Sequence, residues 1–333
     1  MRLRVAVLGA GSWGTTVASL ASHNTTTRLW ARNPDLAREI TEAHTNRRYL
    51  TDIRLPEDLK ATHDMGEAVG EADVVVMGIP SHGFRSVLAE ASRSIRPWVP
   101  VISLAKGLEE NSQLRMTEII QEILPGHPAG VLTGPNLAGE IMGGQAAASV
   151  IAMEDEKIAS QIQDVFRSGL FRVYTNDDVT GCEIAGALKN VIAIAAGMGA
   201  GVGVGDNTQA AVITRGLAEL TRLGVAMGGH PRTFSGLAGM GDLLATCMSA
   251  RSRNRHVGVQ LGQGRKISEI IDEMHMVAEG VKTCRVVMQL ADQYDLEMPI
   301  AREVFGAVHG GRTALQAYRG LVRHRPGSEN EPG

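Results

Sequence analysis

Short apolar runs alternate with helical segments through the first half of the chain. Each run is rich in Val, Ile, Leu and Ala at successive positions, rather than apolar at every second one. Strands of this kind have both faces buried, which is typical of a parallel sheet covered by helices. We therefore expect strands near residues 3–8, 27–31, 73–79, 99–104, 130–133, 147–153 and 171–174.

The pattern changes near Thr180, where strand-like runs disappear. Long segments rich in Ala, Leu, Val and Met follow and predict helices. The expected fold class is α/β, with a doubly wound parallel sheet over residues 1–178, an all-α domain over 179–322 and a disordered tail over 323–333. Glycines alternate over residues 197–206 after a helical segment, which favours a flexible connection there over a second phosphate loop.

Gly9, Gly11 and Gly14 follow the first predicted strand with G-x-G-x-x-G spacing. The first glycine permits a tight turn, the second lets the backbone approach a pyrophosphate, and the third lets helix and strand pack closely. The anion would bind at the N-terminus of the helix that starts near Thr15, where free amides and the helix dipole favour negative charge. In a chain with 39 glycines the spacing alone is weak, but its position directly after the first strand favours a dinucleotide site over an ordinary turn.

Loops at residues 80–82, 105–107 and 134–136 also follow predicted strands. Ligands collect at the carboxyl ends of strands in parallel sheets, so these loops are candidates for one crevice. His82 lies in the first loop, and the sequence leaves open whether it touches a ligand.

Composition excludes several classes of function. Lys and Arg number 33 and Asp and Glu 36, and the net charge of −3 argues against a nucleic-acid partner. The three cysteines match neither a disulfide framework nor a zinc site, and the ten histidines include no H-E-x-x-H pair, so we expect reduced thiols and no metal. The first apolar run leads directly into the glycine turn, and we expect no signal peptide, no membrane span and a cytoplasmic protein.

Lys189 and Asn190 interrupt a segment, residues 184–198, that is otherwise apolar on every side and predicts a buried helix. An unpaired ammonium is costly there. One interpretation is structural, with Lys189 either in a salt bridge or extending to the edge of the helix. The other is that the pKa of Lys189 is lowered so that it exchanges a proton with a substrate. Lys106, Arg253 and an oxidised nicotinamide ring are candidate sources of the neighbouring positive charge that would lower this pKa.

Asp242 lies among small and apolar residues, where it is either a helix N-cap or a partner for Lys189 or a substrate hydroxyl. Shortly after it, residues 252–256 read Ser-Arg-Asn-Arg-His. Two guanidiniums and an amide suit a phosphate dianion, because arginine offers paired donors in a fixed fork. The alternative for this cluster is a solvated basic turn.

Together these segments resemble the bacterial type of NAD(P)-dependent glycerol-3-phosphate dehydrogenase over about residues 3–320. The resemblance rests on several short blocks in order, which lie at residues 9–14, 80–82, 106–109, 134–136, 188–193, 213–219, 239–243, 252–254 and 279–280. It implies a Rossmann-type domain joined to a helical domain, with the active site between them. One departure is Asn136, followed by Leu137, where the family usually has Ser or Thr followed by an aromatic residue. Asn136 can still form a hydrogen bond.

The resemblance also implies roles for single residues, with Lys189 as the proton acceptor. Substrate binding is implied for Lys106, Gly134, Asn136, Lys189, Asp242, Ser252, Arg253 and Asn254. Dinucleotide binding is implied for Gly9, Gly11, Ser12, Trp13, Gly14, Arg32, Lys106, Ala138, Arg253, Val277 and Glu279. The implied reaction is reversible hydride transfer between sn-glycerol 3-phosphate and NAD(P)+. The implied physiological direction is reduction of dihydroxyacetone phosphate, which supplies glycerol 3-phosphate for phospholipid synthesis. The implied assembly is a homodimer.

Cofactor preference is predicted from the end of the second strand. A chain selective for NAD usually places Asp or Glu there, whereas here Arg32 and Asn33 follow Ala31 and the first carboxylate is Asp35. We therefore expect NADPH to be used at least as well as NADH.

Two other classes of protein share part of this pattern. The β-hydroxyacid dehydrogenases also carry a helix lysine but tend to place Asn four residues after it, where this chain has Ala193. A non-catalytic dinucleotide-binding regulator would have no need for Lys106, Lys189, Asp242 and Arg253 together.

Overall fold

The computed structural model describes residues 2–274 and 277–323, and the chain divides into two compact units. Unit 1 contains the chain up to Ala105 and residues Arg115–Val179, and unit 2 contains Lys106–Leu114 and the chain from Thr180 onward. The sequence did not predict that residues 106–114 group with the helical part of the chain. They do so because Leu108 is buried in the helical core and Gln113 donates a hydrogen bond to Gln289.

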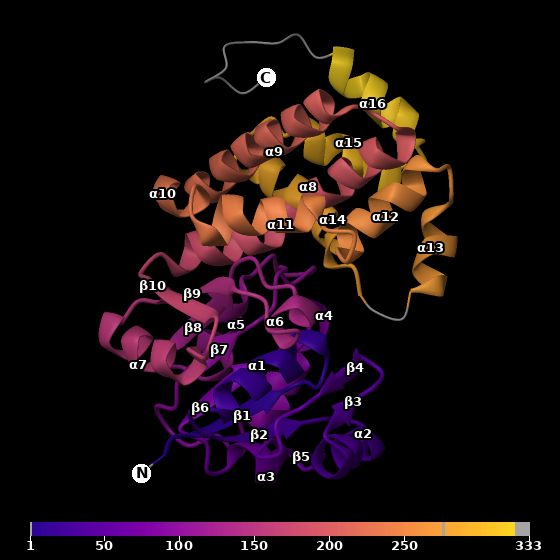
Figure 1. The fold of residues 1–333 in the computed structure, drawn as a ribbon. Helices are drawn as coiled ribbons and strands as arrows, with labels where there is room; N and C mark the ends of the chain where they lie inside the picture. The colour runs from indigo at the N-terminus through magenta and orange to yellow at the C-terminus, as the bar shows by residue number, and fades with distance from the viewer. Residues whose placement is uncertain (1, 275–276, 324–333) are drawn as a thin grey trace. The chain divides into compact units, whose positions relative to one another are not determined.

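Unit 1 is built on an eight-stranded sheet with the order β10-β9-β8-β7-β6-β1-β2-β5 (Figure 1). Its strands are β1 (Arg4–Leu8), β2 (Thr26–Trp30), β5 (Lys60–Thr62), β6 (Val74–Met77), β7 (Val101–Ser103), β8 (Ala129–Thr133), β9 (Ala147–Met153) and β10 (Phe171–Asn176). A separate antiparallel pair is formed by β3 (Thr45–Asn46) and β4 (Leu50–Arg54).

Helices cover both faces of the sheet, as the doubly wound prediction requires. They are α1 (Ser12–Ser22), α2 (Pro34–Arg38), α3 (Met65–Val69), α4 (Ser81–Ala91), α5 (Met116–Ile123), α6 (Ala138–Met142) and α7 (Glu156–Phe166), with a π-helical turn η1 at Glu39–Ala43. Helix α1 contacts α6 and α7, while α4 contacts α3 and α5, so the two groups lie on opposite faces.

The strand prediction is wrong in direction at one edge of the sheet. All pairs from β8 to β5 are parallel, but β9 runs antiparallel to β8, and β10 follows β9 in parallel. The connection from β8 to β9 contains only the five-residue helix α6 and returns the chain beside β8 instead of crossing the sheet. The strands β3, β4 and β5 were not predicted, because their sequences are short and polar.

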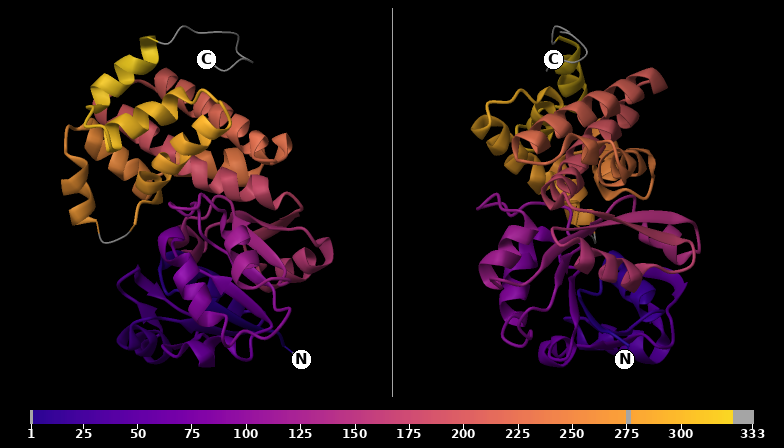
Figure 2. Two further views of the ribbon diagram at one scale, coloured as in Figure 1. Left: turned by 180° about the vertical axis from the view of Figure 1, so that it is seen from behind. Right: turned by 90° about the vertical axis from the view of Figure 1, so that its left-hand side faces the viewer.

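In unit 2 all of the described secondary structure is helical (Figure 2). The helices are α8 (Val179–Val202), which starts at the end of unit 1, then α9 (Asp206–Ala226), α10 (Pro231–Phe234), α11 (Asp242–Met248), α12 (Arg253–Gly262), α13 (Ile267–Glu273), α14 (Glu279–Gln293), α15 (Pro299–Val308) and α16 (Ala314–Arg323), with a π-helical turn η2 at Leu237–Gly241. Arg323, where the tail was predicted to begin, ends α16, and residues 324–333 lie outside the described part of the chain.

Helix α8 is the central element of unit 2. It has 24 residues, and an 18-residue window within it has a mean hydropathy of 1.4, so it is long and apolar enough to cross a membrane by length and composition, contrary to the sequence expectation. Because 89% of its apolar window is buried inside the structure, its composition is that of a core helix.

The predicted flexible connection at residues 197–206 is helical as far as Val202. A Cβ on Gly197 or Gly201 would collide with the backbone of α12, so these glycines permit close helix packing instead of a loop.

Candidate active site

The glycine turn has the geometry that its spacing predicts. Gly9 has φ +111°, and a Cβ there would lie 2.5 Å from the Gly78 oxygen, while a Cβ on Gly14 would collide with the Gly9 oxygen. Gly11 precedes the first turn of α1, and apart from its neighbours in the chain no atom of the described residues lies within 4 Å of the position that its Cβ would take. The backbone is therefore open at the residue that should approach a pyrophosphate.

Other predicted dinucleotide contacts of unit 1 lie at strand ends or helix starts. Ser12 and Ala138 are the first residues of α1 and α6, and Arg32 is exposed just after β2. The Nε1 atom of Trp13 is buried and has no hydrogen-bond partner among the described residues. An unsatisfied buried donor in this turn fits an oxygen-rich ligand.

The residues directly after β2, from Ala31 to Pro34, include no carboxylate. Asn33 caps α2 by accepting from the amides of Asp35 at 2.8 Å and Leu36 at 3.2 Å. The Asp35 carboxylate forms an ion pair with Arg38 at 3.4 Å. Arg32 is therefore the charged group that this strand end offers to a dinucleotide.

The loop after β8 holds a second polar group. Gly134 has φ +123° and packs against the backbone of Ser149, and the Asn136 Oδ1 atom accepts from the Ser149 hydroxyl at 2.5 Å. The Asn136 Nδ2 atom and the Thr133 hydroxyl are buried without a partner among the described residues. Asn136 is thus held by its oxygen, with its amide nitrogen left to donate to a ligand. His82 is exposed in the first turn of α4.

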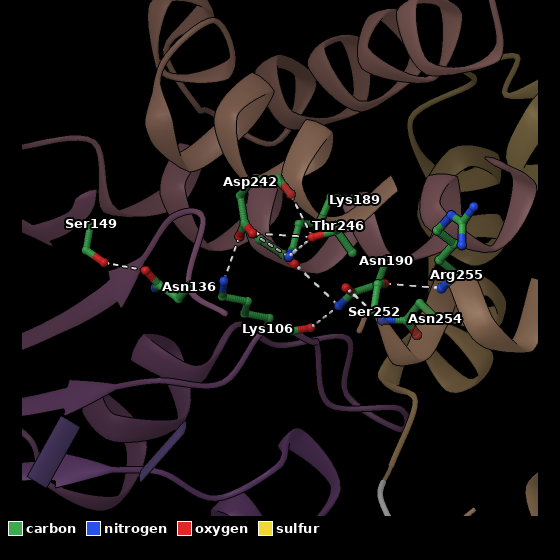
Figure 3. A network of polar contacts seen from close by, with 11 residues as sticks. Lys106, Asn136, Ser149, Lys189, Asn190, Asp242, Thr246, Ser252, Asn254 and Arg255 are labelled. Atoms are coloured by element: carbon green, nitrogen blue, oxygen red, sulfur yellow. Dashed lines mark hydrogen bonds and ion pairs between the residues drawn. The ribbon is translucent and has the colours of Figure 1, made fainter. Parts of the chain in front are cut away.

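Unit 2 contains a buried charge cluster of two lysines and one carboxylate (Figure 3). Lys189 Nζ lies 2.6 Å from Asp242 Oδ1, and Lys106 Nζ lies 2.7 Å from Asp242 Oδ2. The exposed fractions of the side chains are 5% for Lys189, 2% for Asp242 and 16% for Lys106. One carboxylate therefore serves two ammonium groups, and the cluster carries a net positive charge when both lysines are protonated.

Thr246 completes the surroundings of Lys189. Its hydroxyl accepts from Lys189 Nζ at 2.6 Å and donates to the Asp242 carbonyl at 2.6 Å. Asp242 begins α11 and Thr246 lies one turn later, so the two side chains share a helix face. Together they use two of the three hydrogens of the Lys189 ammonium.

The electrostatics lower the pKa of Lys189 to about 8. Burial is the largest cause and the charge of Lys106 adds to it, while Asp242 acts in the opposite direction. Burial also raises the pKa of the neighbouring Cys247 thiol to about 12, so this thiol stays neutral. Lys189 can therefore hold or release a proton near neutral pH, as an acid–base group must.

The cationic segment forms the start of α12. The Ser252 hydroxyl caps the helix by accepting from the Arg255 amide at 3.2 Å, and Arg253 donates to the Val277 carbonyl at 2.7 Å. Arg253 is exposed, whereas Asn254 is buried. Glu279, the other predicted dinucleotide contact, begins α14 and lies within electrostatic range of Arg253.

Asn190 connects these parts, although the sequence analysis gave it no role. Its Nδ2 donates to the Lys106 carbonyl at 2.8 Å, and its Oδ1 accepts from Asn254 Nδ2 at 2.9 Å. Thr246 and Ser149 were also missed. Only Thr246 had a sequence signal, since it lies four residues after Asp242, whereas the contacts of Asn190 and Ser149 are made by tertiary packing.

The chain resembles known proteins along almost its whole length. A family model described as NAD-dependent glycerol-3-phosphate dehydrogenase N-terminus matches residues 4–159, and the corresponding C-terminus model matches residues 178–319. The chain is 62% identical, over the full length of both proteins, to "Glycerol-3-phosphate dehydrogenase [NAD(P)+] 2" of Sphingopyxis alaskensis. It is 58% identical to "Glycerol-3-phosphate dehydrogenase [NAD(P)+]" of Mycobacterium avium, over 98% of this chain and 96% of the relative.

Solved structures agree with these relatives. The crystal structure of glycerol-3-phosphate dehydrogenase from Coxiella burnetii superposes with a TM-score of 0.92 and 34% identity, over 97% of this chain and 99% of that one. A ketopantoate reductase from Ralstonia eutropha, at 18% identity and a TM-score of 0.60 over 96% of this chain and all of its own, shares the fold.

Proposed function

The chain belongs to the NAD-dependent glycerol-3-phosphate dehydrogenase family, and on that basis we propose that Lys189 is its acid–base group for the reversible oxidation of sn-glycerol 3-phosphate by NAD(P)+. The observation that carries the proposal is the buried pair of Lys189 and Asp242, whose lysine has a pKa of about 8. A dinucleotide-binding protein without turnover has no use for this costly pair. The family match also removes the β-hydroxyacid dehydrogenase alternative.

The residues of unit 1 fit a bound dinucleotide. The open backbone at Gly11 and the unsatisfied Trp13 donor suit its phosphates and oxygens, and Arg32 suits an additional phosphate on the ribose. When bound, the nicotinamide supplies or accepts the hydride.

The residues of unit 2 then perform the proton transfer. In the oxidation direction, neutral Lys189 takes the proton from the secondary hydroxyl. In the reduction direction, protonated Lys189 returns it to the ketone oxygen. Asp242 and Thr246 hold the lysine nitrogen, so that its remaining hydrogen or its lone pair is directed to the reacting oxygen.

Phosphate binding is assigned to the first turn of α12. Arg253 offers a forked pair of donors, and Ser252 and Asn254 add polar groups beside it. A phosphate bound there holds the substrate at a point remote from the reacting carbon. Binding energy from such a remote group orients the reacting carbon in the active site.

The direction, location and assembly of the enzyme are further proposals. A lysine with a pKa of about 8 is mostly protonated at neutral pH, so it is in the form that donates a proton during reduction. By family resemblance we propose that the enzyme mainly reduces dihydroxyacetone phosphate and supplies glycerol 3-phosphate for phospholipid synthesis. By family resemblance we propose a cytoplasmic homodimer. Its mass in solution tests the assembly.

A turnover assay tests the proposed function. Purified protein should oxidise NADPH and NADH in the presence of dihydroxyacetone phosphate, and glycerol 3-phosphate should appear in equal amount. A β-hydroxyacid such as 3-hydroxybutyrate should give no turnover with either oxidised cofactor. Binding of NADPH without turnover of dihydroxyacetone phosphate would contradict the proposal and favour a regulator.

A further inference from the structure

Helices α8 and α12 lie with their backbones in contact. Gly197 of α8 faces Gly258 of α12, and Gly201 faces Gly262, so that a Cβ on any of these four glycines would lie within 3.0 Å of the α carbon of the glycine that it faces. The order of the contacts shows that the two helices run in the same direction. The start of α12 contacts α8 at Asn190, the residue after Lys189, through Asn254.

The glycine contacts specify the register between these helices in part, because a side chain in place of Gly258 would collide with the Ile194 carbonyl of α8. If α12 moved along α8 by one turn, about 5.4 Å, Gly201 would still face a glycine, Gly258. Such a slide would carry Arg253, the residue before Asn254, along α8 by the same distance.

A buried polar pair stands in the same row as the glycines. Asn190 on α8 accepts through Oδ1 from Asn254 Nδ2 on α12 at 2.9 Å, and their exposed fractions are 5% and 8%. A slide of one turn would break this bond and leave Asn190 Oδ1 and Asn254 Nδ2 buried without this partner, which is costly. A single buried Asn is a known way to specify register between helices.

The pair also extends to two other segments. Asn190 Nδ2 donates to the Lys106 carbonyl at 2.8 Å, and Asn254 Oδ1 accepts from the Gly280 amide of α14 at 2.9 Å. One chain of hydrogen bonds therefore joins the Lys106 segment, α8, α12 and α14. The Oδ1 and Nδ2 atoms of Asn190 both take part in it, so Asn190 acts on the reaction through its neighbours.

We infer that Asn190 and Asn254 form a register lock, a polar pair that holds the phosphate-binding turn of α12 at a fixed position along α8, at Asn190, the residue after Lys189. Asn190 is a positioning residue for the substrate phosphate. This inference rests on the proposed function, because it takes Arg253 and Asn254 as the phosphate site.

The test compares Asn190→Leu and Asn190→Ala with Gln209→Leu. Gln209 is a matched control, because its Nε2 also donates to α8, to the Ala196 carbonyl at 3.0 Å, but lies outside the chain of hydrogen bonds. We expect both Asn190 variants to raise the KM for dihydroxyacetone phosphate at least about tenfold, from the loss of two hydrogen bonds. The midpoint of the pH profile should stay near 8, because the contacts of Lys189 are retained.

A substrate without a phosphate distinguishes a positioning role of Asn190 from a general loss of structure in its variants. With unphosphorylated dihydroxyacetone the Asn190 variants should match Gln209→Leu in kcat/KM, because this substrate has no phosphate for α12 to bind. If Asn190→Leu does not fold, Asn190→Ala decides the question, because it adds no apolar bulk.

Two results would overturn the inference. One is a KM for dihydroxyacetone phosphate that changes no more than in Gln209→Leu, and the other is an equal loss with both ketones. Either can occur while the wild-type enzyme turns over dihydroxyacetone phosphate. Failure of the proposed function would instead show as absence of wild-type turnover.

Discussion

Replacing Asp242 by Asn should move the acid–base transition of the enzyme to lower pH. The change keeps the size of the side chain but removes the charge that lies 2.6 Å from Lys189 Nζ and 2.7 Å from Lys106 Nζ. At an effective dielectric constant of about 20, two unit charges about 4 Å apart interact by about 4 kcal/mol, and one pKa unit corresponds to about 1.4 kcal/mol. The transition should therefore fall from about 8 by at least about one unit, with about three units as the upper bound.

The same shift in the pKa of Lys189 determines how the stability of Asp242→Asn depends on pH. A buried pair that loses one partner typically costs about 3–5 kcal/mol, because a charge is left uncompensated. Lys189 can avoid part of this cost by releasing its proton, so we expect the loss in thermal unfolding experiments to be larger below the new transition than above it.

The assay is the pH dependence of kcat in both directions. Reduction of dihydroxyacetone phosphate requires protonated Lys189 and should decline above about pH 8 in the wild type, whereas oxidation of glycerol 3-phosphate should rise through the same pH. Both limbs should move to lower pH in Asp242→Asn. Asp242→Glu keeps the charge and should keep the transition near that of the wild type. An unchanged or higher midpoint in Asp242→Asn would refute the assignment of Lys189 as the titrating group.

Three further predictions concern other parts of the chain. Arg32→Ala should impair kcat/KM with NADPH more than with NADH, and equal loss with both cofactors would contradict the role of Arg32. Arg253→Ala should lower kcat/KM with dihydroxyacetone phosphate at least about tenfold but change it little with unphosphorylated dihydroxyacetone, while equal loss would place Arg253 in the cofactor site or the fold. Glu219 caps α15 by accepting from the amides of Ile300 at 2.7 Å and Ala301 at 3.1 Å, and burial raises its pKa to about 7 from 4.5. The folded state therefore holds the proton of Glu219 more strongly than the unfolded state does. As the pH rises from 4.5 to about 7, the free energy of unfolding of the wild type, measured with denaturant, should fall relative to that of Glu219→Gln. Equal changes with pH in the two proteins would contradict this prediction.

Local sequence patterns predicted the parts of the fold that depend on local physics. The glycine turn was foreseen because Gly9 and Gly14 are required by contacts within one strand–turn–helix unit, and most strands of the sheet were foreseen because they are apolar on both faces. The direction of β9 was not predicted, because it depends on which neighbour the chain returns to after the short α6.

In unit 2, too, contacts between segments far apart in the chain were not predicted from the sequence. Glycines at 197 and 201 read as a flexible segment, since the backbone of α12 that requires them lies more than 50 residues later in the chain. The buried lysine and Asp242 could be named from the sequence as unusual charges in apolar surroundings. That Lys106 joins them, and that Asn190 links Lys106 to Asn254, follows only from the tertiary structure.

The most direct test of the central claim is the turnover of Lys189→Ala at saturating dihydroxyacetone phosphate and NADPH. General acid–base catalysis contributes about 100-fold to 10,000-fold, so turnover should fall at least about 100-fold, and the residual rate should no longer change across pH 8. NADPH affinity, measured in the same preparation, should stay unchanged. A folded Lys189→Ala enzyme with near-normal turnover, or with the same decline above pH 8, would contradict the assignment of Lys189 as the proton donor and acceptor.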